Sequence, residues 1–174
     1  SLDDRVTFED RHWERYREVN QKFADSVVDT LDTDSHETGD SDSDEADAEN
    51  DRNTVVWFQD YHFGLAPQFV RESVGTDALL SQFWHIPWPE REVFRDCPHG
   101  AELLRGLLAN DLLGFHVPTY CANVLDCVST MLPEAAVDWE NWTVSLADSD
   151  HETRLRAFPM GVDTEGIADY AAAP

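Results

Sequence analysis

The chain has 174 residues, 41% of them apolar, which is the length and composition of one ordinary domain with a buried core. Its 36 acidic and 12 basic residues give a formal net charge of -24, and Lys22 is the only lysine. A surface of this charge repels nucleic acid and anionic membranes, which argues against partners of either kind. The longest apolar runs are also far shorter than the roughly 20 residues that span a bilayer.

The acidity and the cysteines indicate the environment of the protein. A local tail that binds a basic partner is one explanation of the acidity, and a surface adapted to high salt is the other. High salt is favoured because acidic residues recur outside the densest run, as in "TFEDRHWE" and "PEREVFRDC". Cys97, Cys121 and Cys127 show no CxxC pairing and leave an odd thiol, which suits a reducing compartment. We therefore expect a cytoplasmic protein of halophilic type.

The first predicted element is an amphipathic helix over residues 9–31, whose apolar residues recur at three- and four-residue spacings. The run that follows, "DTDSHETGDSDSDEADAEND", is half acidic and contains no lysine, arginine or aromatic residue, so it cannot bury enough apolar surface to order itself. A calcium loop from Asp40 is less favoured, because Glu45 stands where that loop needs glycine and Asp51 where it needs glutamate. We expect a disordered acidic insertion at about 32–53.

From residue 54 onwards, short apolar runs alternate with helical patterns. The apolar runs predict strands at 54–58, 78–84 and 112–117, and the helical patterns predict helices at 67–74, 101–110 and 119–132. Two more strands are predicted at 142–146 and 154–160, joined by a polar turn as a hairpin or a sheet edge. Apolar strands separated by helices are typical of a parallel sheet with helices on both faces. The fold class is therefore α/β, as a Rossmann-like half.

Polar side chains follow the first three of these strands. They are Asp60, Tyr61, His62, His85 and His116. Because ligands of open parallel sheets bind beyond the carboxyl ends of the strands, we expect these groups to meet at one edge. Asp60 and His85 are the strongest candidates, because each ends an apolar strand, where an ionisable group is costly without a partner. Tyr61 as a half-buried ring, His62 as a helix cap and His116 as a structural histidine are the alternatives.

Other chemistries are less favoured at this edge. Asp60 and the three histidines include suitable metal donors, but they come from separate loops and lack a local signature such as HExxH. The chain contains no GxSxG elbow for a nucleophile and no GxGxxG or GxxxxGK[ST] loop for phosphates. We therefore expect no metal and no other cofactor.

Five segments carry a resemblance to a known family. In order, "YREVNQKFAD", "VVWFQDYHFGLAP", "FWHIPWP", "RGLLANDLLGFH" and "FPMGVD" resemble the trehalose-6-phosphate synthases, retaining glycosyltransferases of family 20. The resemblance implies a GT-B enzyme with two Rossmann-like domains, of which residues 1–174 would be part of the N-terminal, acceptor-side domain. It also implies transfer of glucose from a nucleotide sugar, usually UDP-glucose, to glucose 6-phosphate, giving trehalose 6-phosphate.

The resemblance assigns roles to residues. The aspartate of the family's "DYH" motif contacts the acceptor sugar and matches Asp60, and the histidine of its "HIP.P" motif hydrogen-bonds the donor glucose and matches His85. We expect Tyr61 and His62 to contact substrate as well. The chain departs from the family at Gln59, which is commonly histidine, and at Trp88, which is commonly phenylalanine.

The implied partners are the two substrates and the missing C-terminal GT-B domain, without which the isolated chain is expected to be inactive. Self-association as a homo-oligomer is compatible with the sequence. Three other functions stay open: a transferase like glucosylglycerol-phosphate synthase, a non-catalytic sugar-binding or regulatory relative, and an acidic interaction module.

Overall fold

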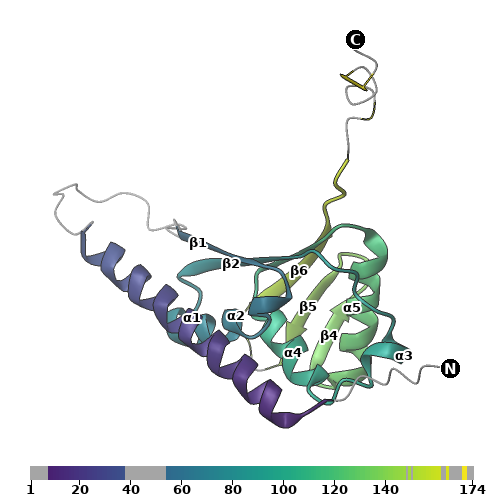
Figure 1. Cartoon of the computed structure of the whole chain (residues 1–174), viewed down its shortest axis with the longest axis horizontal. Coiled ribbons are helices and arrows are strands. Elements are labelled where there is room, and N and C mark those ends of the chain that lie inside the picture. The colour runs from purple at the N-terminus through teal and green to yellow at the C-terminus, as the bar shows by residue number, and fades with distance from the viewer. Residues whose placement is uncertain are drawn as a thin grey trace.

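The computed structural model describes residues 8–37, 54–147, 149, 151–161, 164 and 170–171. Its architecture is one six-stranded sheet with helices packed against it (Figure 1). The strands are β1 (Thr54–Gln59), β2 (Ala78–Trp84), β3 (Leu112–Phe115), β4 (Ala135–Asp138), β5 (Thr143–Leu146) and β6 (Glu152–Ala157). The helices are α1 (Asp10–Glu37), α2 (Ala66–Val74), α3 (Arg91–Phe94), α4 (Gly100–Leu107) and α5 (Pro118–Met131), with a 3-10 turn η1 (Tyr61–Phe63).

The strand order is β1-β2-β3-β6-β5-β4. β1, β2, β3 and β6 are parallel neighbours, whereas β5 runs antiparallel to both β6 and β4. The predicted α/β class is confirmed, and β5 and β6 form the expected hairpin. β4 was not predicted, because its four residues alternate between half-exposed and exposed and form no long apolar run.

The described helices cover one face of the sheet (Figure 1). Side chains that point to this face are buried, as in β2, where buried and half-exposed residues alternate along the whole strand. The other face is apolar as well, but Val55 and Trp57 on it are 61% and 64% exposed. The expectation of helices on both faces is therefore met on one face by the described residues. Apolar side chains on both faces are what made the strand sequences continuous apolar runs.

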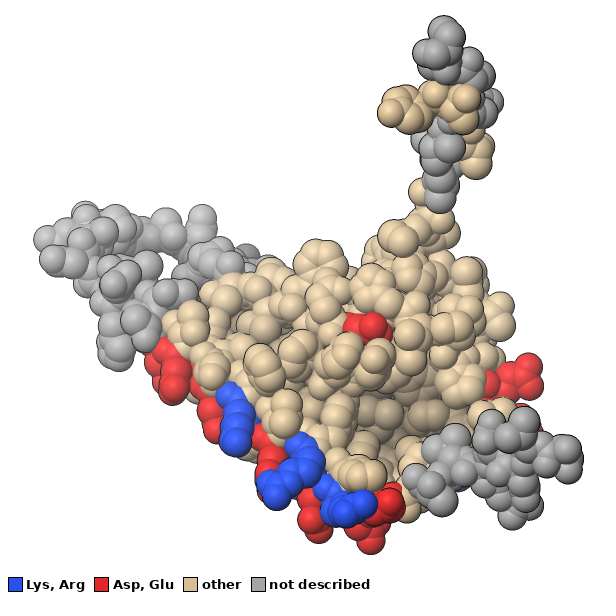
Figure 2. Space-filling view, viewed as in Figure 1, with Lys and Arg blue, Asp and Glu red and all other residues tan. Residues whose placement is uncertain are grey.

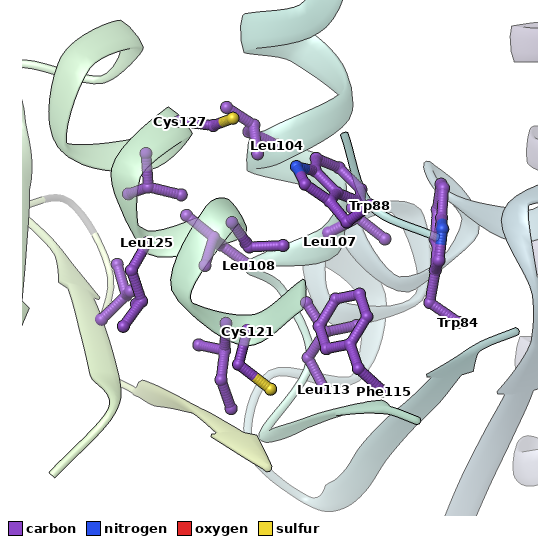
Figure 3. Packing of buried hydrophobic residues seen from close by; sticks show 14 of the residues in the cluster. Trp84, Trp88, Leu104, Leu107, Leu108, Leu113, Phe115, Cys121, Leu125 and Cys127 are labelled. Carbon is purple, nitrogen blue, oxygen red and sulfur yellow. The ribbon is translucent and has the colours of Figure 1, made fainter. Parts of the chain in front are cut away.

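Most of the core lies between the sheet and the pair α4 and α5 (Figure 3). Leu104, Leu107, Leu125 and Leu155 are among its fully buried side chains. Burying a side chain of this size contributes about 1.5–3 kcal/mol, so this cluster fixes the two helices on β3 and β6. A smaller cluster joins α1 and α2 to β1 and β2, and consists of Ala24, Phe58, Ala66, Val70, Ala78 and Leu80.

α1 continues past Leu31, its predicted end, to Glu37, so the start of the acidic run is helical. Extending an existing helix adds a hydrogen bond for each residue ordered, which favours continuation. Residues 38–53 lie outside the described residues, so the disordered insertion and the calcium loop at Asp40 stay predictions.

Acidic and basic side chains gather along α1 (Figure 2). None of the described helices combines the length and the apolar character needed to cross a membrane.

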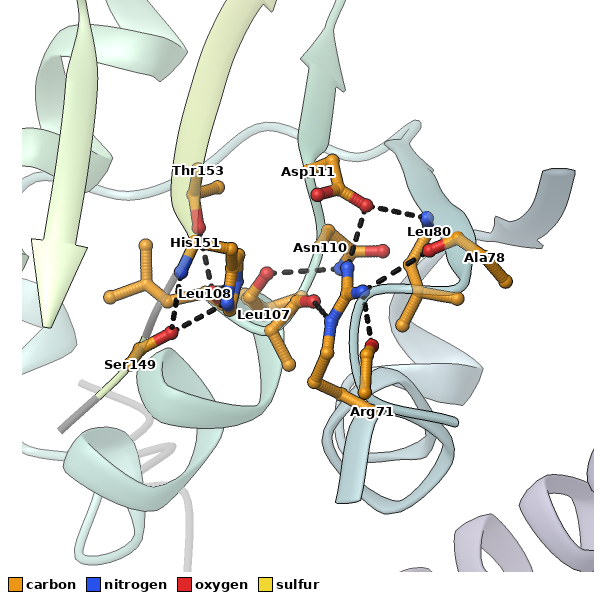
Figure 4. Close-up of polar contacts among 12 residues, drawn as sticks. Arg71, Ala78, Leu80, Leu107, Leu108, Asn110, Asp111, Ser149, His151 and Thr153 are labelled. Atoms are coloured by element: carbon orange, nitrogen blue, oxygen red, sulfur yellow. Dashed lines mark hydrogen bonds and ion pairs between the residues drawn. The ribbon is translucent and has the colours of Figure 1, made fainter. Parts of the chain in front are cut away.

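A network around Arg71 of α2 ties together the amino ends of β2 and β3 (Figure 4). Its guanidinium forms an ion pair with Asp111, with Nη2 and Oδ2 2.6 Å apart. The same group donates hydrogen bonds to three backbone carbonyls, those of Gly75, Ala78 and Ala109. Asp111 Oδ2 also accepts a hydrogen bond from the N–H of Leu80, at 2.8 Å.

Candidate functional site

The structure brings Asp60, His85 and His116 to one edge of the sheet, at the carboxyl ends of β1, β2 and β3. The backbone N–H of His85 donates to Asp60 Oδ1 at 3.2 Å. The rings of His85 and His116 have centroids 5.4 Å apart. The convergence predicted from the strand ends is therefore present for these three residues.

Asp60 has an unusual backbone conformation. Its φ of 62° and ψ of -175° lie in a region that residues other than glycine rarely adopt. β2 holds both of its backbone groups, because Asp60 N–H donates to the carbonyl of Phe83 at 2.7 Å and Gln82 Nε2 donates to the Asp60 carbonyl at 2.9 Å. Such conformations cost about 1–3 kcal/mol and cluster at functional sites. The surrounding bonds thus keep a carboxylate in a place that its own backbone disfavours.

We predict that Asp60→Gly is more stable than Asp60→Ala. Both substitutions remove the carboxylate, but only glycine relieves strain of about 1–3 kcal/mol, against about 0.5–1 kcal/mol of extra chain entropy lost on folding. The expected difference in the free energy of unfolding is about 1 kcal/mol, measured by urea denaturation. The matched pair Gln59→Gly and Gln59→Ala, in the regular strand β1, should show the opposite order. A glycine variant at position 60 that is less stable than the alanine variant contradicts the strain.

Two polar side chains of α1 hold the turn that follows Asp60. The Tyr16 hydroxyl donates to the carbonyl of Tyr61 at 2.6 Å and accepts from the N–H of Gly64 at 2.8 Å. Burial raises the pKa of Tyr16 to about 12, so its hydroxyl stays protonated at neutral pH. Asn20, which is fully buried, donates to the carbonyl of His62 and accepts from the first two backbone N–H groups at the start of α2.

Sequence reasoning missed Asn20 as a residue that supports the site. The available signal was a polar residue directly beside the apolar stripe of the first helix, next to Val19. Its amide can accept and donate at once, which lets it satisfy backbone groups of both η1 and α2. α1 therefore contributes to the site through the turn that it fixes.

Tyr61 and His62 lie on a different side of the turn from His85. Their rings stack with centroids 4.1 Å apart, and Tyr61 is 43% exposed. Tyr61 lines a hollow of about 320 Å³ beside α1, together with Trp13 and Trp84. Tyr61 and His62 together line a second hollow, between α1 and the turn η1. The structure thus separates these two predicted residues from the pair of Asp60 and His85.

His85 faces the uncovered side of the sheet. It lines a hollow of about 630 Å³, whose other walls include Trp57, Phe83 and Met160. Its Nε2 lies 2.8 Å from Gln59 Oε1, and its ring packs against that of Phe83 with centroids 4.6 Å apart. An imidazole fixed in this way, at the rim of an apolar surface, suits recognition of a polar ring such as a sugar.

Two of the three thiols are unsuited to nucleophilic attack, and the described residues offer no metal centre at this edge. Burial raises the pKa of the Cys121 thiol to about 11 and also raises that of Cys127, so both stay protonated at neutral pH. A thiol attacks as the thiolate, which makes both poor nucleophiles. Within the described residues, no three His, Cys, Asp or Glu side chains come together as ligands for a metal ion. What the edge does present is one carboxylate, imidazoles and aromatic surface.

Comparison with models of known protein families shows to which family this chain is related. The model of glycosyltransferase family 20 matches residues 42–174, which is most of the chain. The chain belongs to glycosyltransferase family 20. This confirms the resemblance seen in the five sequence segments.

Individual family 20 relatives agree. The chain is 30% identical to the UDP-forming alpha,alpha-trehalose-phosphate synthase of Schizosaccharomyces pombe over 94% of its length. It is 33% identical to the bifunctional trehalose-6-phosphate synthase/phosphatase of Thermoproteus tenax over 97% of its length. A solved structure from E. coli with bound UDP-2-fluoro glucose has the same fold, with a TM-score of 0.72 and 25% identity over 97% of this chain.

The family 20 chain spans only part of these proteins. It covers 28% of the S. pombe enzyme, 20% of the T. tenax enzyme and 32% of the E. coli chain. The greater part of each relative therefore has no counterpart in the 174 residues.

Proposed function

We propose that the full-length protein is a retaining glycosyltransferase that transfers glucose from UDP-glucose to glucose 6-phosphate and forms trehalose 6-phosphate. The observation that carries this proposal is the pairing of Asp60 with His85 at the carboxyl edge of a sheet that matches the E. coli structure with bound UDP-2-fluoro glucose. The S. pombe relative, which is named for forming UDP, supports the choice of nucleotide.

Asp60 is the residue proposed to bind the acceptor sugar. The bond from His85 N–H engages Oδ1, which leaves Oδ2 to accept a hydrogen bond from a sugar hydroxyl. Hydrogen bonds to an ionised carboxylate are about twice as strong as those between neutral groups. The strained but well-held backbone of Asp60 keeps this carboxylate in one place before the acceptor arrives.

His85 is the residue proposed to bind the donor glucose. Contacts with Gln59 and Phe83 fix the plane of its ring, so the imidazole needs little reordering to meet a hydroxyl of the donor. Because His85 also donates its backbone N–H to Asp60 Oδ1, the two residues lie side by side at the same edge of the sheet. Tyr61 and His62, which lie on the α1 side of the turn, would contact the phosphate-bearing end of the acceptor.

Retention follows from front-face departure and attack, in which the leaving phosphate takes the proton of the acceptor hydroxyl. A double displacement would need two carboxyl groups about 5 Å apart. Asp60 is the only carboxylate among the described residues that directly follow β1, β2 and β3. The chain's residues would therefore orient the two sugars and exclude water, while nucleotide contacts come from the rest of the enzyme. We infer that the reaction needs no metal and takes place in the cytoplasm.

The test is an assay of the full-length protein with UDP-glucose and glucose 6-phosphate, in which UDP release and trehalose 6-phosphate are measured together. We expect both products in equal amounts from the full-length protein and none from residues 1–174 alone. Glycerol 3-phosphate in place of glucose 6-phosphate tests the glucosylglycerol-phosphate alternative. Binding of the sugars without any transfer would instead identify a non-catalytic relative.

A further inference from the structure

Two buried amide side chains form a chain of hydrogen bonds that ends on Asp60. Asn110, which follows α4 and is fully buried, donates from Nδ2 to Gln82 Oε1 at 3.1 Å and to the carbonyl of Leu107 at 2.9 Å. Gln82 of β2, which is 1% exposed, donates from Nε2 to the carbonyl of Asp60 at 2.9 Å. This series of hydrogen bonds thus runs from the end of α4, along the buried face of the sheet, to Asp60 (Figure 4 shows its Asn110 end).

These amides stand where apolar side chains would fill the core. Gln82 points to the same face of β2 as Leu80 and Trp84, both of which are buried. Burying an amide is costly unless it is hydrogen-bonded. Even here the pair is incompletely satisfied, because Asn110 Oδ1 has no hydrogen-bond partner among the described residues. Stability alone therefore does not account for two amides at these positions.

The last bond of this series, at Asp60, indicates what Gln82 and Asn110 do. Asp60 has a backbone conformation that its side chain disfavours, and its two peptide groups are each held by one bond from β2. The bond from Asp60 N–H to Phe83 belongs to the backbone ladder. The bond to the Asp60 carbonyl comes from the Gln82 side chain. Without it, the Asp60 carbonyl keeps only the longer, 3.5 Å bond from the N–H of Phe63, so the peptide group that follows Asp60 rotates more easily and shifts the carboxylate.

We propose that Gln82 and Asn110 are positioning residues for Asp60: Gln82 fixes the Asp60 carbonyl, and Asn110 fixes the Gln82 amide. Both act through Asp60: Asn110 is fully buried, and Gln82, which borders the hollow of His85, is only 1% exposed and directs its Nε2 to the Asp60 carbonyl. The proposal rests on the proposed function in one respect, that Asp60 binds the acceptor sugar. It predicts that loss of the pair weakens acceptor use more than donor use.

The experiment compares Gln82→Met, Asn110→Ala and the double variant of the full-length enzyme. Each single variant breaks the bond between the two amides and leaves the remaining buried amide without that partner, which should lower the melting temperature, whereas the double variant removes both amides and should recover part of that loss. The acceptor kcat/KM of the double variant should nevertheless stay about 3- to 10-fold low, the equivalent of one lost hydrogen bond, with the KM for UDP-glucose unchanged. Thr153→Val is the control, because Thr153 makes a buried bond to Leu108 away from Asp60. It should lower stability without a change in acceptor kinetics.

A double variant with the acceptor kcat/KM of the wild type overturns the proposal, as does an equal loss for both substrates. A crystal structure of the double variant gives a readout independent of activity. We expect residue 60 to leave its positive-φ conformation there, and retention of that conformation with an unmoved carboxylate overturns the proposal. A wild-type enzyme that transfers no glucose sinks the proposed function instead, and the positioning role is then decided by that crystal structure.

Discussion

Arg71→Met is expected to destabilise the chain by about 3–5 kcal/mol, the cost of removing one partner from a largely buried ion pair. The side chain of Arg71 is 11% exposed and that of its partner Asp111 is 19% exposed. Methionine keeps much of the apolar stem but leaves Asp111 without its counter-charge. It also removes the donors that Arg71 gives to three backbone carbonyls. Urea denaturation followed by tryptophan fluorescence measures the loss.

Two controls separate the parts of this effect. Arg71→Lys keeps the positive charge but replaces the planar fork by one ammonium group, which cannot reach all four acceptors, so an intermediate loss is expected. Arg15→Met breaks the ion pair with Glu18 on the exposed surface of α1, where both side chains are more than half exposed, and should change stability little. A loss at Arg71 no greater than that at Arg15 would contradict a structural role for the network.

β1, β2 and β3 were predictable because each is a largely apolar run. β1, β2 and β3 begin and end within a few residues of their predicted bounds. β6 begins two residues before the predicted segment 154–160 and ends three residues before the end of that segment. The place of β6 between β3 and β5 was not predictable, because strand order depends on how α5 and β4 cross the sheet and leaves no local signal. β4 escaped detection for the same reason that it is a weak edge strand: its residues alternate between half-exposed and exposed.

The site was predictable to the level of strand ends. Asp60 and His85 were found because polar groups end apolar strands, and the structure joins them by a hydrogen bond. The positive φ of Asp60 was not predictable, because its sequence neighbours look like the ordinary end of a strand. Gln82 was visible as a polar residue within the run "ALLSQFW", but its partner Asn110 is distant in sequence. Local patterns therefore find the groups proposed to bind ligands more readily than the buried groups proposed to position them.

In the full-length enzyme, Asp60→Asn and His85→Ala are expected to fall on different substrates. Asp60→Asn keeps the shape of the side chain but removes the charge that would strengthen its proposed hydrogen bonds to acceptor hydroxyls. His85→Ala removes the proposed contact to the donor sugar, while the backbone N–H of residue 85 stays in place to bind Asp60 Oδ1. The loss of a hydrogen bond to a charged group costs about 1.5–3 kcal/mol, which corresponds to roughly a 10- to 150-fold loss in kcat/KM for each variant.

The kinetic pattern distinguishes the two roles. For Asp60→Asn the loss should appear mainly when glucose 6-phosphate is varied, and for His85→Ala mainly as slower turnover with UDP-glucose. His116→Ala serves as a matched control, since His116 packs beside His85 and Phe83 at the same edge but has no proposed substrate contact. Kinetics of Asp60→Asn and His85→Ala within about twofold of the wild type would contradict both assignments.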